Sequence, residues 1–246
     1  MKISYQLILL IFLTGQKIIA QEAMSENKGY KYNQNFDVAL STNINQSSGA
    51  ISWVKFHGIT KKQRFKIGYG LRFTSQFGNN LNYVTAPAII TSKQTGPQVL
   101  FSPIYYENVD TFQVSNAQNN ALNLSINLQY TFKSKFDVGF NIDAVGFSFG
   151  KKVTGKYISY QDKTNPQSQT ASPTSFNLLL VSDNDIGSLN SELYFRYWFT
   201  QKFAFKAGAT FLFTEYTTNN KLRLENDRWR NKSLMGMIGI TFSPFR

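Results

Sequence analysis

The 246-residue sequence contains no cysteine and only one histidine, His57. The absence of cysteine excludes a disulfide framework, a lipid-modified N-terminal cysteine and any thiolate metal site. Charged residues are also scarce, at 16% of the chain, against about 25% in typical soluble domains. Aromatic residues, in contrast, make up 15% of the sequence. This composition fits a protein whose outer surface faces lipid.

The N-terminus has the pattern of a secretory signal peptide over residues 1–20. Lys2 precedes the apolar run Leu7–Leu13, and Ala20 ends a segment that suits cleavage. The run is too short to cross a bilayer as a helix, which needs about 20 apolar residues. We therefore predict an exported protein in which residues 21–35 form an N-terminal periplasmic segment and 36–246 form the folded domain.

Two similar strand–turn–strand units, at residues 123–142 and 189–211, dominate the rest of the sequence. In both, apolar and polar residues alternate, and a three-residue turn flanked by aromatic residues joins the two runs. A period of two indicates strands with two unlike faces. Runs of this kind predict eight strands, at 36–45, 49–57, 65–75, 121–132, 136–149, 189–199, 203–214 and 233–245.

The predicted connections differ in length at the two ends of these strands. At one end they are short, at 58–64, 133–135 and 200–202. At the other end 46–48 is short, and the remaining three are long, at 76–120, 150–188 and 215–232. This asymmetry and an even strand number are typical of outer-membrane barrels. The sequence predicts an all-β, eight-stranded antiparallel up-and-down transmembrane β-barrel with three long extracellular loops and periplasmic termini.

The two faces of the predicted strands differ in chemistry. One face carries rows such as Ile67, Tyr69 and Leu71, and the other is mostly Gly, Ser, Asn and Thr. Aromatic residues gather near the short turns, as in the girdles of membrane barrels. A soluble lipocalin-like ligand-binding barrel also alternates, with its apolar row inside and a strongly charged row outside. The nearly neutral polar row favours the membrane barrel and leaves the soluble barrel as an alternative.

The formal net charge of +12 raises nucleic-acid binding as a possible function. The cations do not form one stripe, however, because many lie in the short turns, as Lys62 and Lys135 do, and others lie in 221–232. Cations at strand ends suit contact with anionic headgroups. We therefore expect outer-membrane lipid and lipopolysaccharide as partners, and no nucleic acid.

Three segments carry a resemblance to a known class of proteins: 120–132, 138–147 and the final strand, 237–245. They resemble the small outer-membrane β-barrel proteins of Gram-negative bacteria, of the Bacteroidetes type. The alternating last strand, with Phe242 and Phe245, looks like the signal that the barrel-assembly machinery reads. The resemblance implies insertion from the periplasm, with that machinery as a partner, and it implies no activity.

Few residues are suited to catalysis or metal binding. His57 has no serine among residues 55–60, which argues against the His–Ser pair of outer-membrane lipid-modifying enzymes. The acidic run 183–187 fails the EF-hand pattern, because Gly187 stands where a ligand is needed. We predict no enzyme activity, no cofactor and no metal site, with a lipid-modifying enzyme kept as a further alternative.

Charges on the inward face are the first functional lead. Counting across the 200–202 turn places Arg196 opposite Lys206, and two cations in a narrow interior need carboxylates nearby. The hypothesis is an interior salt-bridge network of Arg72, Asp137, Asp143, Glu192, Arg196 and Lys206. Structural packing is its favoured role, and a narrow small-solute channel gated by these charges is the alternative.

The long predicted loops are the second lead, because loops of this length are uncommon unless they are functional or disordered. Exposed tyrosines in them suit recognition of a partner, and the candidates are Tyr83, Tyr105, Tyr106, Tyr157 and Tyr160. The predicted function is that of a non-enzymatic integral outer-membrane barrel with a structural or surface-interaction role carried by these loops.

Overall fold

The computed structural model describes residues 32–245, except for residues 61 and 134. The predicted signal peptide and residues 21–31 of the predicted periplasmic segment lie outside the described residues. The described part forms one antiparallel sheet of eleven strands, so the predicted count of eight is wrong. The strands are β1 (Tyr32–Thr42), β2 (Gln46–Gly58), β3 (Phe65–Thr85), β4 (Thr111–Lys133), β5 (Phe136–Phe149), β6 (Val153–Ile158), β7 (Gln167–Pro173), β8 (Phe176–Leu178), β9 (Leu189–Trp198), β10 (Phe203–Thr218) and β11 (Arg228–Phe245).

The predicted loops are also wrong in part, since much of their length is strand. β3 continues to Thr85 and β4 begins at Thr111, while β6, β7 and β8 lie within 150–188. Short helices occupy the remainder: α2 (Ala88–Thr91), η1 (Gly96–Phe101), η2 (Tyr106–Asn108), η3 (Ser182–Asn184) and η4 (Arg223–Glu225). No helix in the described residues is long and apolar enough to span a membrane.

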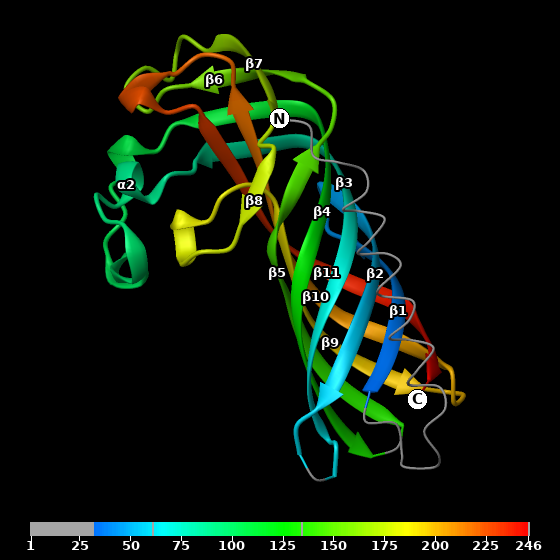
Figure 1. Cartoon of the computed structure of the whole chain (residues 1–246). Coiled ribbons are helices and arrows are strands. Elements are labelled where there is room, and N and C mark those ends of the chain that lie inside the picture. The colour runs from blue at the N-terminus through cyan, green and yellow to red at the C-terminus, as the bar shows by residue number, and fades with distance from the viewer. Residues whose placement is uncertain (1–31, 61, 134, 246) are drawn as a thin grey trace, which may run out of the picture. The chain divides into compact units, whose positions relative to one another are not determined.

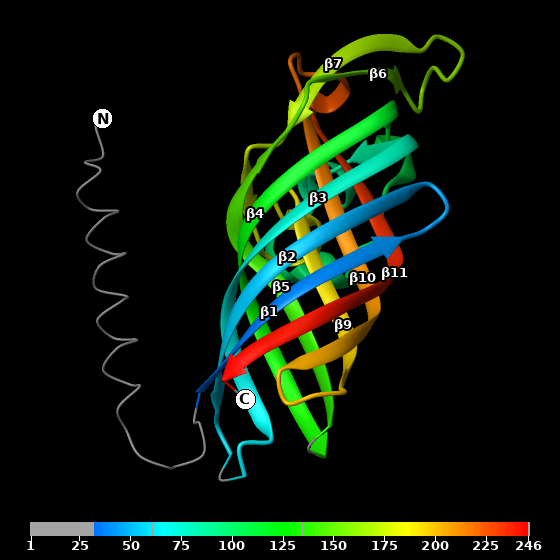
Figure 2. The same cartoon turned by 90° about the vertical axis from the view of Figure 1, so that its right-hand side faces the viewer.

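Eight of the strands pair in a closed ring, hereafter the eight-stranded ring. β1, β2, β3, β4, β5, β9, β10 and β11 each pair with the next in this order. β11 then pairs with β1 along most of its C-terminal half, and Figure 2 shows these two strands side by side. These strands correspond to the eight that the sequence predicts. Their order around the ring is their order in the chain.

A second closed ring, the six-stranded ring, continues four of the same strands beyond the first. β3 pairs with β4, β4 with β6, β6 with β7, β7 with β10 and β10 with β11. β11 closes this ring on β3 through Trp229 opposite Thr85 and Arg230 opposite Val84. Figure 1 shows β6 and β7 at the end of the sheet that is opposite the short turns.

The facing of side chains reverses between the two rings. In β3, Arg72, Thr74 and Gln76 point inward and are buried, whereas farther along the strand Leu81 and Tyr83 are the buried residues. The reversal occurs at Asn80, whose φ of 51° lies in the left-handed region that asparagine tolerates better than most residues. Two consecutive exposed residues therefore replace the alternation at this point.

The partner strand reverses at the same level. Ser115 and Asn116 of β4 are both exposed, and Asn116 pairs with Asn79 of β3. On one side of this step β4 buries Asn119, and on the other it buries Val114. The sequence alternation breaks here, which explains why the predicted strands stopped too early.

In the eight-stranded ring the apolar row faces outward. Leu40, Ile126, Phe195 and Ile238 are all exposed, with Phe195 at 66%. The inward row contains the buried polar residues, together with a smaller set of apolar ones such as Phe56, Trp198 and Met237. The lipocalin-like alternative places the apolar row inside, so the facing of the eight-stranded ring is the reverse of what that alternative predicts.

In the six-stranded ring the apolar side chains face inward and form a continuous core. The rings of Phe112 and Trp229 lie 6.0 Å apart, and Tyr157 contacts Trp229 edge-on at 5.6 Å. The core consists of Leu81, Tyr83, Phe112, Val114, Ala117, Val153, Tyr157, Ala171, Tyr216 and Trp229. This facing is the reverse of that in the eight-stranded ring.

Candidate functional site

The inward face of the eight-stranded ring gathers all six residues of the predicted charge network. Their side chains come from four strands and are 2% exposed or less. The predicted pairing of Arg196 on β9 with Lys206 on β10 is confirmed by the register of these strands. A buried ion is stabilised only when opposite charges and hydrogen bonds surround it, and the interior supplies both.

Arg72 links β3 to the far side of the ring. Its Nη2 donates to Asp143 Oδ1 at 2.6 Å, and its Nη1 lies 3.3 Å from Glu192 Oε1. Nη1 also donates to Asn141 Oδ1 at 2.7 Å, and Nη2 donates to the Asn190 carbonyl at 2.7 Å. The guanidinium therefore cross-links β3, β5 and β9 through the interior.

Lys206 and Arg196 share carboxylates on both sides. Lys206 Nζ donates to Glu192 Oε2 at 2.6 Å and lies 3.6 Å from Asp37 Oδ2. Arg196 Nη2 lies 3.2 Å from Asp37 Oδ2, and its Nη1 is 3.9 Å from Asp137 Oδ2. Glu192 thus connects Lys206 to Arg72, and the predicted residues form one network.

Asp37 is the member of this network that sequence reasoning missed. It lies on β1, is buried, and accepts hydrogen bonds from both Arg196 and Thr241. Its inward position follows from the alternation Asp37, Ala39, Ser41, which is visible in the sequence. Its partners come from β9, β10 and β11, which only closure of the ring brings to β1.

Tyr194 fills the interior beside the cations. Arg196 Cζ lies 4.8 Å and Lys206 Nζ 4.5 Å from the centre of its ring, within cation–π range. The ring occupies the space above Gly139, where a Cβ atom would come within 2.3 Å of it. Glycine at this position is therefore what allows the tyrosine to fill this level of the barrel.

A second charged cluster lies farther along, where β10 and β11 enter the six-stranded ring. Glu215 Oε1 accepts a hydrogen bond from Arg228 at 2.7 Å, and its Oε2 accepts one from Arg230 at 2.8 Å. Lys232 pairs with Asp183 of η3. Sequence reasoning treated most of these residues as loop and missed the cluster, although Glu215 and Arg230 are buried.

The remaining chemical candidates are His57 and the acidic run 183–187. The His57 ring stacks on Tyr69 with the ring centres 5.9 Å apart. Asp185, in the acidic run, is buried and accepts the backbone N–H of Leu180 at 2.7 Å, and burial raises the pKa of its carboxyl. Within the described residues no group of three or more His, Asp or Glu side chains is placed to hold a metal ion.

The five candidate recognition tyrosines divide into two groups. Tyr83 and Tyr157 are buried in the core of the six-stranded ring, so the expected exposure of these two is wrong. Burial raises the pKa of both phenols, because an apolar core disfavours the ionised form. Tyr106 and Tyr160 are exposed, and Tyr105 is partly exposed beneath the Lys93 ammonium.

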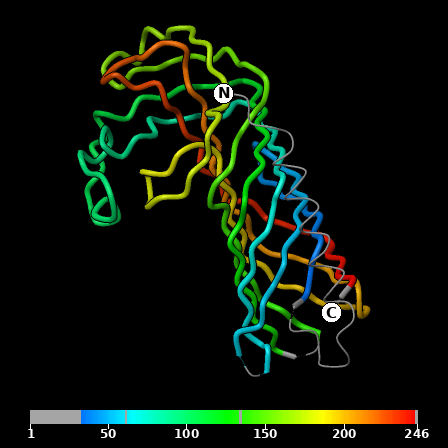
Figure 3. The backbone as a smooth tube through the Cα atoms, viewed as in Figure 1, coloured from blue at the N-terminus to red at the C-terminus, as the bar shows by residue number. Residues whose placement is uncertain are grey.

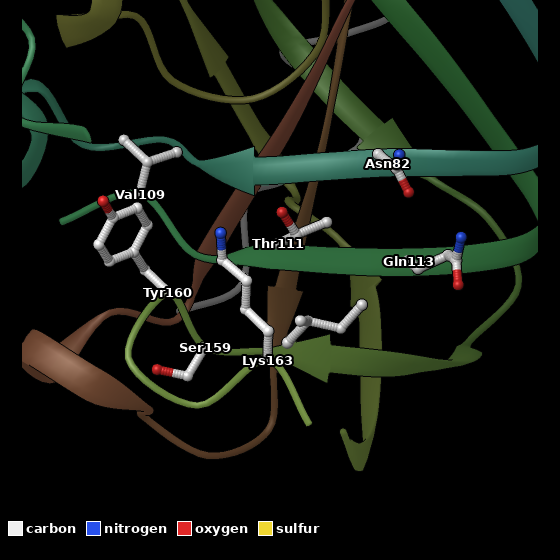
Figure 4. A pocket seen from close by; sticks show the side chains of 8 residues that line it. Asn82, Val109, Thr111, Gln113, Ser159, Tyr160 and Lys163 are labelled. Carbon is white, nitrogen blue, oxygen red and sulfur yellow. The ribbon is translucent and has the colours of Figure 1, made fainter. Parts of the chain in front are cut away.

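Tyr160 lines a surface pocket of about 320 Å³ on the outside of the six-stranded ring. Figure 4 shows Tyr160 next to Val109 and Lys163 pointing toward Thr111, with Asn82 and Gln113 farther along the neighbouring strands. Lys163 Nζ lies 4.9 Å from the centre of the Tyr160 ring. The pocket therefore presents amides, hydroxyls and one ammonium, groups suited to a polar ligand.

No protein-family model matches this chain, and no curated protein matches it. Solved structures do resemble it weakly. The neisserial surface protein NspA is 7% identical, with 88% of this chain and 99% of NspA covered, at a TM-score of 0.37. Ail, the attachment invasion locus protein of Yersinia pestis, is 8% identical over 86% of this chain and 97% of its own, at 0.32.

A major outer membrane protein of Thermus thermophilus is 10% identical, with 85% of this chain and 99% of that chain covered, at a TM-score of 0.37. These structural neighbours are outer-membrane β-barrel proteins. At identities of 7–10% and TM-scores of 0.32–0.37, these neighbours assign no function to this chain.

Proposed function

We propose that this chain is an integral outer-membrane barrel whose eight-stranded ring crosses the bilayer. The observation that carries the proposal is the exposed apolar row of that ring around a buried charged interior. In water, such a wall would be a contiguous exposed apolar surface of a kind that soluble monomers rarely carry. In lipid, the same wall is solvated, and the closed ring satisfies its backbone groups internally.

Aromatic contacts near the short turns support one membrane boundary there. Phe203 lies 5.1 Å from Phe242, and Phe242 lies 6.4 Å from Phe36, measured between ring centres. Phe199 stacks on Phe203 at 6.4 Å. Aromatic rings favour the headgroup level of a bilayer. The first described strand also starts at this end and the last one finishes there, so we assign this end to the periplasm.

The role that fits this interior is structural and non-enzymatic. Eight strands enclose little more than their own side chains, and here the ion pairs of Arg72, Arg196 and Lys206 and the Tyr194 ring occupy that space. The ring would then hold the six-stranded ring and its connections outside the cell, where they meet a partner. Lipopolysaccharide and outer-membrane lipid would surround the wall.

Cell fractionation of the full chain tests the membrane assignment. We expect recovery in the outer membrane and a gel band that shifts on boiling, because a closed barrel resists detergent until heated. Recovery as soluble periplasmic protein would overturn the proposal. Conductance of the purified protein in planar bilayers tests the filled interior, and steady ion-selective steps would favour the gated-channel alternative.

A further inference from the structure

The segment between β3 and β4 exposes a cluster of apolar side chains, hereafter the apolar tip: Ile89, Leu100, Phe101, Ile104 and Tyr106. Phe101 is 91% exposed and Tyr106 is 70% exposed. Neither lies on the apolar wall of the eight-stranded ring. Both belong to the connection that joins the end of β3 to the start of β4, at the ends of these strands that form the six-stranded ring. The proposed outer-membrane barrel alone therefore leaves this cluster unexplained.

The tip is held in place by contacts with a second connection. η1 and α2 both contact η3, and Asn184 Nδ2 donates to the Gly96 carbonyl at 3.1 Å. Within the segment, the Tyr105 N–H donates to the Thr91 carbonyl at 2.7 Å. Leu180, just before η3, is also exposed. The apolar side chains of the tip are thus presented to the outside by an ordered scaffold.

The path of the segment points it toward the membrane. In Figures 1 and 3 the segment leaves the six-stranded ring near α2 and runs down the picture, in the direction in which the short turns lie. The eight-stranded ring lies in that direction. A loop that turned away from the ring would place the same side chains in water.

The charge of the segment also suits a lipid surface. Between Ala88 and Tyr106 the sole charged residue in the sequence is Lys93. Its Nζ lies 4.5 Å from the centre of the Tyr105 ring. A lysine and tyrosines bordering apolar side chains form the combination that favours the headgroup level, with the charged or hydroxyl end in water.

We propose that the apolar tip inserts into the outer leaflet beside the barrel and acts as a second, peripheral membrane anchor. Insertion of an amphipathic surface of this kind reaches about 5–10 Å into the boundary between headgroups and acyl chains. The tip then fixes the six-stranded ring close to the membrane surface. This inference rests on the proposed function, because it requires the eight-stranded ring to span the bilayer.

The test uses the absence of cysteine, which lets one introduced cysteine carry a polarity-sensitive fluorophore. The full chain is reconstituted in phosphatidylcholine vesicles that contain lipids spin-labelled near the headgroup. The label is placed by Phe101→Cys at the tip, by Phe195→Cys on the wall and by Gln161→Cys on an exposed loop of the six-stranded ring. We expect about twofold or greater quenching at positions 101 and 195, with none at 161.

The three positions separate the two proposals. Quenching at 195 with none at 101 would overturn insertion of the tip and would keep the membrane barrel. The apolar tip would then be a surface for a protein partner. A label at 195 that is not quenched would overturn the membrane barrel itself.

A charge variant tests whether the apolar side chains cause insertion. With the label at Tyr106→Cys, we expect Phe101→Asp to abolish quenching, because a carboxylate opposes entry into the leaflet. Gln98→Asp is the matched control, since Gln98 is an exposed polar residue of the same short helix. Equal quenching in both variants would overturn the role of the apolar side chains.

Discussion

The two rings of this protein share four strands but have opposite interiors. The eight-stranded ring buries ion pairs and exposes apolar side chains, whereas the six-stranded ring buries tyrosine, phenylalanine and tryptophan and exposes polar ones. A single strand, β4, contributes Asn123 to the first interior and Phe112 to the second. The comparison teaches that alternation defines the two faces of a strand, and that it does not decide which of the two a ring buries.

The two interiors are also held together by different forces. In the eight-stranded ring, specific charges such as Arg72 with Asp143 must be satisfied by partners at fixed positions. In the six-stranded ring, packing of apolar rings such as Phe112 against Trp229 supplies the stability, and it is less directional. Substitutions in each ring should therefore fail for different reasons.

The largest effect is expected from Arg72→Met. This change leaves Asp143 and Glu192 buried without their shared guanidinium, which costs about 3–5 kcal/mol of folding free energy. The measurement is urea unfolding of the protein refolded in lipid vesicles. Lys151→Met, at an exposed position, is the control and should unfold like the parent chain. Equal stability of the Arg72 and Lys151 variants would show that the network does not stabilise the ring.

Trp229→Ala tests the other interior. It removes the largest side chain of the apolar core, at a cost of about 3–5 kcal/mol, and the cost should fall on the six-stranded ring. Hydrogen exchange should therefore accelerate in β6 and β7 and stay unchanged in β1 and β2. Trp53→Ala, which truncates a half-buried tryptophan of the eight-stranded ring, is the comparison. Faster exchange in all four strands would contradict separate stability of the rings.

The outward faces can be compared by placing the same charge on both. Leu71→Arg puts a cation on the apolar wall and should cost about 2–4 kcal/mol near the bilayer midplane. Asn82→Arg puts it on the exposed face of the six-stranded ring and should cost almost nothing. Folding into lipid vesicles measures both. Equal costs would mean that the two outward faces meet the same solvent.

The smallest effect is expected at the reversal itself. Asn80→Val forces a β-branched residue into a left-handed conformation, at a cost of about 1–3 kcal/mol, and should loosen the junction between the rings. Asn80→Gly keeps that conformation accessible and should be close to neutral. Thermal unfolding in detergent compares the two variants. If the valine variant were as stable as the glycine variant, the left-handed conformation at position 80 would not be required for the junction between the rings.

The sequence predicted the parts of the molecule in which its alternation is regular. These are most strands of the eight-stranded ring, the opposition of Arg196 and Lys206, and the inward placement of Glu192 and Asp143. It did not reveal β6, β7 or β8, whose short runs carry weak alternation of their own. The sequence places Tyr83 and Tyr157 in loops, although both lie on strands. For Tyr83 the reason is the break in alternation at Asn79–Asn80, beyond which β3 continues.

The residues by themselves determined the two faces of each strand, since successive side chains of a strand point to opposite sides. Only the tertiary structure decided which groups meet inside. Asp37 is near the start of the described chain and Thr241 near its end, yet they share a hydrogen bond because β1 pairs with β11. Ring closure is a property of strand pairing across the whole sheet, and no local pattern encodes it, because it depends on residues far apart in the chain. The reversal at Asn80 does leave a local mark, since the alternation of β3 breaks there.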